Sequence, residues 1–323
     1  MKRVVGGLIA ALLLASATVA QAQTWPDRPI KLIVPTGPGA ATDVMARLMA
    51  DDVGRRLGQT MVVENRAGAS GIPAHQAAAT ADPDGYTFLF SNTSGLASNP
   101  VSFKKLPYDP AADFAAVAMV VNLGPQMFSV HKAVPVKNMP ELLAYARANP
   151  GKVSYAADAT AGGAVFAGRL LNKKASLGMA EVPYRSAAQM VQDAATGIVP
   201  LLVSSIAVAA PFHQTGDLRP VAVMSSKRFP TMPDVQAVNE TLPGVQIDGW
   251  FVVVAPKGTP APIIQKVNAA VGEFLRGPEI QKRLNDIGLA TGGADTPEGT
   301  AALIKKEQAA WRELAKELDI QAQ

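Results

Sequence analysis

The feature that most constrains the fold is an order of segments that occurs twice along the chain. Residues 30–35 form a short apolar segment rich in β-branched side chains, and a turn of small residues and a helical segment follow it. The same order begins again at residues 152–158. Strands that alternate with helices are typical of parallel sheets with right-handed crossovers. The sequence therefore predicts two similar α/β halves.

Each predicted half contains four strands. They are expected at residues 30–35, 61–66, 83–92 and 114–120 in the first half and at 152–158, 180–185, 199–205 and 218–226 in the second. Two further strands, at 124–131 and 248–258, are expected to cross between the halves, and the helical C-terminal region is expected to pack on the first half. We place the first lobe at residues 23–123 and 246–323 and the second at 124–245.

The first 22 residues have the pattern of a secretory signal peptide. Lys2 and Arg3 precede an apolar run at residues 4–14, and the motif AQA at residues 20–22 supplies a cleavage site. We expect cleavage after Ala22, export to the periplasm and no later membrane span. Removal of two of the 30 basic residues leaves 28 against 26 acidic ones, so the mature chain has a formal charge of +2.

The composition excludes several functional classes. Cysteine is absent, which rules out disulfides, thiolate metal sites and cysteine nucleophiles. Hydrophobic residues make up 48% and charged residues 17%, so a chain of this length can bury a sizeable core without disulfides. No block of basic residues with interleaved aromatic side chains is present, and we therefore expect no nucleic-acid partner.

Motifs for nucleotide binding and for catalysis are weak or missing. The sequence GPGAAT at residues 37–42 begins like a dinucleotide-binding loop, and Glu64 lies where a ribose-binding acid would, but proline separates the glycines and Thr42 takes the third small position. There is no P-loop and no nucleophile elbow. The histidines are not spaced as metal ligands; they are His75, His131 and His213. We predict no cofactor, no metal and no catalytic residue, with an exported hydrolase that uses Asp43 or a serine as an alternative.

A binding site is predicted where each half begins. The turns at residues 36–43 and 158–163 consist mainly of small residues, and each connects a strand to a helix, the first with Thr42 as its predicted N-cap. The N-terminus of a helix presents unpaired N–H groups and the positive end of the helix dipole, which suit a carboxylate or phosphate. Both turns lie at the carboxyl ends of strands, where α/β proteins bind ligands. Two facing halves would hold one anion from both sides.

Several motifs together resemble the Bug family, the extracytoplasmic solute receptors of tripartite tricarboxylate transport systems. They are WPDRPIKLIVPTGPGAATDVMARLMA, LGQTMVVENRAGASG, DPDGYTFLFSNTSGLASNP, VPYRSAAQMVQDAATG, LRPVAVMSSKRFPTMPDVQAVNE and GWFVVVAPKGTPAP. The resemblance covers essentially the whole chain. It implies a type II periplasmic-binding-protein fold, in which two α/β lobes close over a small, often carboxylated solute. It also implies integral membrane subunits of the transporter as partners.

Departures from the family pattern cluster in the two turns. The first loop of the family usually reads Pro-Phe-x-Pro-Gly-Gly-x-Thr-Asp, and here Thr36 replaces the aromatic residue and Ala40 the second glycine. The second loop usually reads Gly-x-Gly-Ser/Thr followed by histidine. Here residues 159–162 are Ala-Thr-Ala-Gly, and Val165 takes the histidine position. We expect these departures to change the choice of ligand rather than the fold.

The predicted binding residues come from the two turns and from strand ends. They are Thr36, Gly37, Pro38, Gly39, Ala40, Ala41, Thr42, Asp43, Ser91, Asn92, Asp158, Thr160, Ala161, Gly162, Gly163, Tyr184, Ser204 and Ser205. Backbone N–H groups of residues 40–42 are expected to bind a carboxylate, while Asp43 braces the first loop by bonding its backbone. An Asp158 carboxylate that points into the cleft would instead favour an amine or a donor-rich ligand.

The predicted function is capture of a dicarboxylate, a tricarboxylate or an aromatic acid by lobe closure, followed by delivery to a tripartite tricarboxylate transporter. One cleft is enough for this task, so we expect a monomer. A ligand receptor for a sensor kinase and a binder of an amine-containing or neutral solute are the alternatives.

Overall fold

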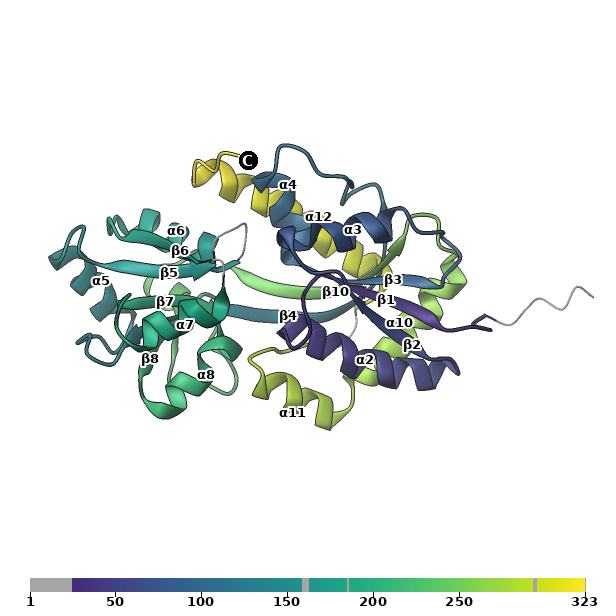
Figure 1. Cartoon of the computed structure of the whole chain (residues 1–323), viewed down its shortest axis with the longest axis horizontal. Coiled ribbons are helices and arrows are strands. Elements are labelled where there is room, and N and C mark those ends of the chain that lie inside the picture. The colour runs from purple at the N-terminus through teal and green to yellow at the C-terminus, as the bar shows by residue number, and fades with distance from the viewer. Residues whose placement is uncertain (1–24, 159–162, 185, 293–294, 323) are drawn as a thin grey trace, which may run out of the picture.

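The computed structural model describes residues 25–158, 163–184, 186–292 and 295–322, which form two α/β lobes (Figure 1). Strands β4 (Phe114–His131) and β10 (Asp248–Pro256) run through the centre of the molecule and connect the lobes. The strand order is β2-β1-β3-β10-β4-β7-β5-β6, and β8 pairs with β4 and β9. This architecture confirms the predicted fold class.

The first lobe contains β1 to β3 and the parts of β4 and β10 beside them. Its elements are β1 (Ile30–Val34), α2 (Ala41–Leu57), β2 (Met61–Asn65), η1 (Ala69–Gly71), α3 (Ile72–Ala79), β3 (Thr87–Asn92), η2 (Ser94–Ser98), α4 (Asn99–Ser102), α10 (Ala261–Leu275), α11 (Pro278–Asp286) and α12 (Pro297–Glu317). β1 is parallel to β2 and β3, as predicted. Met45, Met49 and Val53 form the buried face of α2, which packs with α10 against the sheet.

The second lobe repeats the alternation of strands and helices. Its elements are α5 (Met139–Ala148), β5 (Ser154–Asp158), α6 (Gly163–Ala175), β6 (Ala180–Tyr184), α7 (Ala187–Ala195), β7 (Leu201–Ser205), α8 (Ile206–Thr215), β8 (Leu218–Val223), β9 (Gln236–Ala237) and α9 (Val238–Thr241). β5 is parallel to β6 and β7, as predicted. Ser186 caps α7 and accepts a hydrogen bond from the backbone N–H of Gln189 at 3.4 Å.

The prediction of two separate strands at residues 114–120 and 124–131 is wrong. Residues 114–131 form the single strand β4, which is antiparallel to β10, β7 and β8. Gly124 and Pro125 lie inside this strand, paired with Gly249 and Asp248 of β10. Register shifts between β4 and β10 absorb the irregularity, so the strand continues from one lobe into the other.

The predicted N-cap of α2 is also wrong. The N-cap is Ala40, whose φ of −66° and ψ of 154° are extended, and Thr42 is buried inside the first helical turn. The N–H of Ala40 donates to the carbonyl of Gly37 at 3.3 Å, so a backbone turn precedes the helix. The nearby side-chain acceptor is Asp43, which bonds the backbone of Gly39 instead.

Helix α12 belongs to the first lobe and reaches the second (Figure 1). It packs on β4, η2 and α4, as expected for the C-terminal region. Its Trp311 meets Phe166 of α6 edge to face, and Glu317 forms an ion pair with Lys174 of α6. Within the described residues, no helix is both long and apolar enough to cross a bilayer.

Candidate functional site

A cavity lies between the two lobes. Its lining residues are Ala41, Asn92, Thr93 and Ser94 from the first lobe, Gly163, Ser205 and Ala207 from the second, Gly124, Pro125, Gln126, Ile247, Asp248, Gly249 and Phe251 along the connecting strands, and Ile287, Gly288, Leu289 and Trp311 near the C-terminus. The cavity has a volume of about 130 Å³. It therefore suits a small solute.

Three helices begin at this cavity. Ala41 is the first residue of α2, Gly163 is the first residue of α6, and Ser205 is the N-cap of α8. The N-cap of α2, Ala40, has no polar side chain, and Ser205 makes no side-chain capping bond to α8. The first N–H groups of a helix have no acceptor within the helix, and they carry partial positive charge. Their convergence makes the cavity a candidate site for an anion.

Asp43 holds the loop that precedes α2. Its carboxylate accepts hydrogen bonds from the backbone N–H of Gly39 at 2.9 Å, from Asn65 Nδ2 at 2.7 Å and from Arg47 Nε at 3.0 Å. Burial alone would raise the pKa of Asp43, but these bonds outweigh burial and lower it. The predicted brace is thus confirmed: Asp43 is an ionised structural group whose acceptors are already occupied.

Two polar side chains and one glycine shape the cavity wall. The carboxamide oxygen of Asn92 accepts from the backbone N–H of Gly95 at 3.1 Å, and Thr93 Oγ1 accepts from that of Trp250 at 2.9 Å. The Asn92 bond joins the end of β3 to η2, and the Thr93 bond ties the start of η2 to β10. A Cβ atom on Gly163 would lie 3.2 Å from Gln126 Nε2, so the glycine lets Gln126 approach the start of α6.

The cavity contains almost no charge. Among its described lining residues, Asp248 is the only ionisable one, and no lysine or arginine is present. A bound anion would therefore be held by backbone dipoles and neutral polar groups. The electrostatics are those of three helix N-termini rather than of a basic pocket.

The structure brings together residues from both predicted turns and from two strand ends. The predicted residues that line the cavity are Ala41, Asn92, Gly163 and Ser205. Thr160, Ala161 and Gly162 lie outside the described residues, as does the side chain of Asp158. Whether these residues bind a ligand stays a prediction.

The other predicted residues do not line the cavity. They are Thr36, Gly37, Pro38, Gly39, Ala40, Thr42, Asp43, Ser91, Tyr184 and Ser204. Several of them have partners within their own lobe. Tyr184 Oη donates to Asp193 at 2.8 Å, and Ser204 Oγ donates to the carbonyl of Ser205 at 3.1 Å. Ser91 Oγ bonds His75 Nε2 at 2.8 Å.

Sequence reasoning missed the walls that come from the connecting strands and the C-terminal region. Gln126, Asp248 and Phe251 lie on β4 and β10, and Gly288 and Trp311 follow much later in the chain than the predicted turns. The expected crossing of 124–131 and 248–258 was the one available signal, because a ligand between two lobes must lie beside the strands that join them.

Two histidines pair with serines, one in each lobe, and the His75 pair is buried whereas the His213 pair is partly buried. Besides Ser91, His75 contacts the carbonyl of Gly71 through Nδ1 at 2.9 Å, and His213 Nε2 lies 3.0 Å from Ser129 Oγ. No carboxylate orients His75, so the pair lacks the third member of a hydrolytic triad. Across the described residues, no group of three acidic or histidine side chains is arranged to hold a metal ion.

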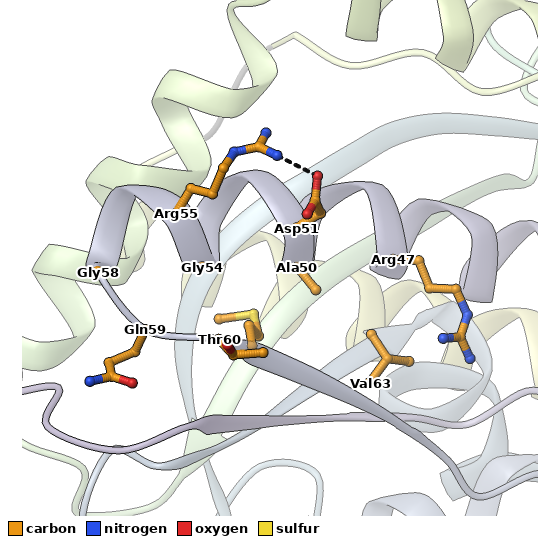
Figure 2. A pocket seen from close by; sticks show the side chains of 10 residues that line it. Arg47, Ala50, Asp51, Gly54, Arg55, Gly58, Gln59, Thr60 and Val63 are labelled. Carbon is orange, nitrogen blue, oxygen red and sulfur yellow. Dashed lines mark hydrogen bonds and ion pairs between the residues drawn. The ribbon is translucent and has the colours of Figure 1, made fainter.

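A second, larger cavity lies on the outside of the first lobe. It measures about 530 Å³ and is a groove between α2 and the edge strand β2, as Figure 2 shows. Its basic side chains are already paired: Arg55 with Asp51 at 2.6 Å, and Arg47 with Asp43. The groove lies along the C-terminal part of α2, away from the helix N-terminus, so the interlobe cavity is the better candidate for an anion site.

The fold and the site define a two-lobed α/β solute-binding protein. A family model described as "Tripartite tricarboxylate transporter family receptor" matches residues 45–320. Protein BugT from Bordetella pertussis is 32% identical over 311 residues, which cover 95% of each chain. The chain belongs to the family of tripartite tricarboxylate transporter receptors, and the resemblance to Bug proteins is confirmed.

Two solved structures show the same fold with a ligand. An R. palustris protein with adipate is 33% identical, with a TM-score of 0.84 and coverage of 93% of this chain and 100% of that one. MatC from Rhodopseudomonas palustris with bound malate is 29% identical, with a TM-score of 0.77 and coverage of 90% and 99%. Both ligands are dicarboxylates.

Proposed function

We propose that this chain is a periplasmic receptor that binds a small organic carboxylate between its lobes and delivers it to the integral membrane subunits of a tripartite tricarboxylate transporter. The proposal includes export with cleavage after Ala22, a monomeric receptor and no catalytic step. The observation that carries it is the convergence of the N-termini of α2, α6 and α8 on one cavity. Relatives with adipate and malate support the ligand class.

Binding between the lobes would stabilise their closed arrangement. The start of α2 belongs to the first lobe, and the starts of α6 and α8 belong to the second, so an anion that contacts all three joins the lobes. A ligand shifts a two-state equilibrium by its difference in affinity for the two states. A closed receptor presents one surface that membrane subunits can recognise.

The first experiment is a thermal-shift and calorimetric screen of the mature protein against mono-, di- and tricarboxylates, aromatic acids and amino acids. A ligand that binds the folded state raises the melting temperature by mass action. We expect at least one carboxylate to raise it. If no carboxylate binds, the proposal is wrong.

A matched pair of variants tests the helix N-terminus of α2. Ala41→Pro removes one backbone N–H at the first helical position, where proline is well tolerated and where the extended Ala40 can precede it. We expect a loss of affinity of roughly 5- to 50-fold for a carboxylate. Ala187→Pro makes the same change at the exposed start of α7, which does not line the cavity, and should leave affinity unchanged. If both variants lose the same affinity, the backbone N–H of Ala41 does not contribute to binding.

A further inference from the structure

His75 lies in α3 and is completely buried. Through its neighbours it is connected to two segments that supply parts of the cavity wall. The first segment is the turn before α2, which ends at Ala41, and the second runs from the end of β3 into η2 and contains Asn92. Ala41 and Asn92 line the interlobe cavity, whereas His75 does not. A buried side chain at this place can fix two parts of the wall relative to each other without touching a ligand.

The two ring nitrogens of His75 have different roles. Nδ1 lies 2.9 Å from the carbonyl oxygen of Gly71, which can only accept, so Nδ1 carries the proton and donates. Burial lowers the pKa of His75 to about 4, so the ring is neutral at pH 7 and carries one proton. Nε2 therefore accepts a hydrogen bond from the Ser91 hydroxyl at 2.8 Å. The ring thus joins the start of α3 to the end of β3.

The bond to Gly71 reaches the turn before α2. Gly71 has a φ of 77°, and a Cβ atom there would lie 2.7 Å from Cβ of Pro35, so its backbone packs against the residue that follows β1. Ser70, which precedes it, has a φ of 54°, a conformation that is costly for a residue other than glycine. The carbonyl of Ser70 accepts from Asn99 Nδ2 at 3.0 Å. His75 and Asn99 therefore hold a strained segment against the turn.

The bond to Ser91 reaches η2. Ser91 precedes Asn92, whose carboxamide oxygen accepts from the backbone N–H of Gly95. A Cβ atom on Gly95 would overlap His75 Nε2, so η2 packs directly on the imidazole. The ring of Tyr108 stacks on the imidazole with centroids 5.1 Å apart, and its Oη donates to the carbonyl of Gly95 at 2.7 Å. The position of η2 therefore depends on where the imidazole lies.

We propose that His75 is a positioning residue for the candidate anion site, which fixes the turn before α2 and the start of η2 relative to each other. This inference rests on the proposed function, because both segments belong to the wall of the proposed ligand cavity. A wall that is already in place costs less to order when a ligand binds. Ser91, which the sequence predicted as a ligand contact, has the role of holding His75.

His213 offers a comparison within the same chain. Its Nε2 lies 3.0 Å from Ser129 Oγ, and burial lowers its pKa to about 4 as well. This pair joins β4 to the C-terminal part of α8, away from the start of that helix, and neither residue lines the interlobe cavity. If a histidine–serine pair served stability alone, the loss of either histidine would leave ligand affinity unchanged.

Two variants separate the two hydrogen bonds of His75. In His75→Asn the amide lies near the position of Nδ1, so it can still donate to Gly71 but does not reach Ser91. In His75→Gln the amide lies near the position of Nε2, so it can still accept from Ser91 but loses the bond to Gly71. Ser91→Ala removes the same bond as His75→Asn and keeps the imidazole, so it tests the connection to η2 even if His75→Asn does not fold.

Hydrogen–deuterium exchange of the unliganded mature protein, followed by mass spectrometry, reports on each segment. The backbone N–H groups of Gly39 and Gly95 are hydrogen bonded, and their exchange should quicken when their segments loosen. We expect faster exchange at residues 92–95 in His75→Asn and Ser91→Ala, and at residues 36–43 in His75→Gln. Peptides from the second lobe should exchange as in the parent protein.

Ligand affinity is measured by calorimetry with malate and adipate at pH 7.5. We expect each His75 variant to bind roughly 3- to 30-fold more weakly than the parent protein. The double variant His75→Asn, Ser91→Ala should lose no more than either single variant, because both changes remove one bond. His213→Gln is the matched control, and it should lower the melting temperature while affinity and exchange at both segments stay unchanged.

The outcomes separate the two proposals. Unchanged exchange at both segments overturns the positioning role of His75, and so does faster exchange with the affinity of the parent protein. Equal losses of affinity in His213→Gln and the His75 variants also overturn it, because they would reflect stability alone. If malate, adipate and every other carboxylate fail to bind the parent protein, the receptor function is wrong, and exchange alone then decides whether His75 holds the two segments.

Discussion

Trp311 of α12 and Phe166 of α6 meet edge to face, with ring centroids 4.6 Å apart and ring planes inclined by 76°, and this contact joins the two lobes. Trp311 also lines the interlobe cavity, whereas Phe166 is buried behind it. The arrangement links the ligand cavity to a contact between lobes. Loss of the contact should therefore affect the relative position of the lobes as well as stability.

Phe166→Leu tests this link. We expect the free energy of unfolding to fall by about 1–2 kcal/mol and carboxylate affinity to fall several-fold, because the closed arrangement loses a contact. Phe229→Leu is the matched control, since Phe229 is also fully buried in the second lobe but lies in a core cluster without α12. Urea unfolding and calorimetry check both variants. Equal loss of affinity in the two would show that the aromatic contact has no role in closure.

Local patterns in the sequence predicted the units of the fold. Met45, Met49 and Val53 are spaced four residues apart, which indicates one helix face, and they form the buried face of α2. Ser186 and Thr296 are residue types that favour helix N-caps, and each is the N-cap of a helix. Each of these signals depends on neighbours within one or two turns. The continuity of β4 through Gly124 was not predictable in this way, because it depends on pairing with Gly249, far along the chain.

The candidate site was predictable to the same extent. Ala41 and Gly163 were named because each lies in a turn of small residues between a strand and a helix, and both line the cavity. Asp248 and Trp311 carry no local mark of function. They join the cavity only because β10 returns to the first lobe and α12 packs across toward α6. These parts of the cavity wall depend on long-range pairing between elements, which a single sequence does not specify.

Asp43→Ala should loosen the loop before α2. The change leaves the N–H of Gly39 and the side chain of Asn65 without their shared acceptor. We expect a loss of about 2 kcal/mol in the free energy of unfolding and at least tenfold weaker carboxylate binding, because the start of α2 is no longer held. Asp43→Asn keeps one acceptor oxygen and should recover part of both. If Asp43→Ala bound the carboxylate as tightly as the parent protein, Asp43 would not be needed to hold the start of α2 in place.

Stability should fall as the pH drops from about 6.5 toward 4. Burial lowers the pKa of His75 and of His213 to about 4, whereas an unfolded histidine titrates near 6.5. Between pH 6.5 and pH 4 the unfolded state therefore binds more protons than the folded state. The contribution of the neutral histidines to stability is complete above pH 6.5 and is lost as the pH falls toward 4. For the fully buried His75 the loss approaches about 3 kcal/mol.

Asp248 acts in the opposite direction over part of that range. Burial and the neighbouring charge of Glu307 raise its pKa to about 6, so the folded state takes up a proton before the unfolded state does, which adds stability as the pH falls from 6 to 4. Urea unfolding at several pH values should show a net decline in the parent protein, a shallower one in His75→Gln and a steeper one in Asp248→Asn. A profile that is flat in all three would contradict the assigned shifts.

Gly249 and Gly124 face each other on the two strands that connect the lobes, and both line the cavity. A Cβ atom on Gly249 would lie 2.6 Å from the carbonyl oxygen of Gly124, which is backbone and cannot move away without separating the strands. A Cβ atom on Gly124 would meet the end of the Leu289 side chain at 3.1 Å and the carbonyl oxygen of Gly249 at 3.2 Å.

These contacts predict an order of effects. Gly249→Ala should lower the free energy of unfolding by about 1–3 kcal/mol and weaken ligand binding, because β10 must move from β4 beside the cavity. Gly124→Ala should cost less, because Leu289 can change rotamer and alanine also reduces the entropy of the unfolded chain. Urea unfolding and calorimetry of the two variants measure the difference. A greater cost for Gly124→Ala would show that the Leu289 side chain, rather than the approach of the two strands, sets the packing at this point.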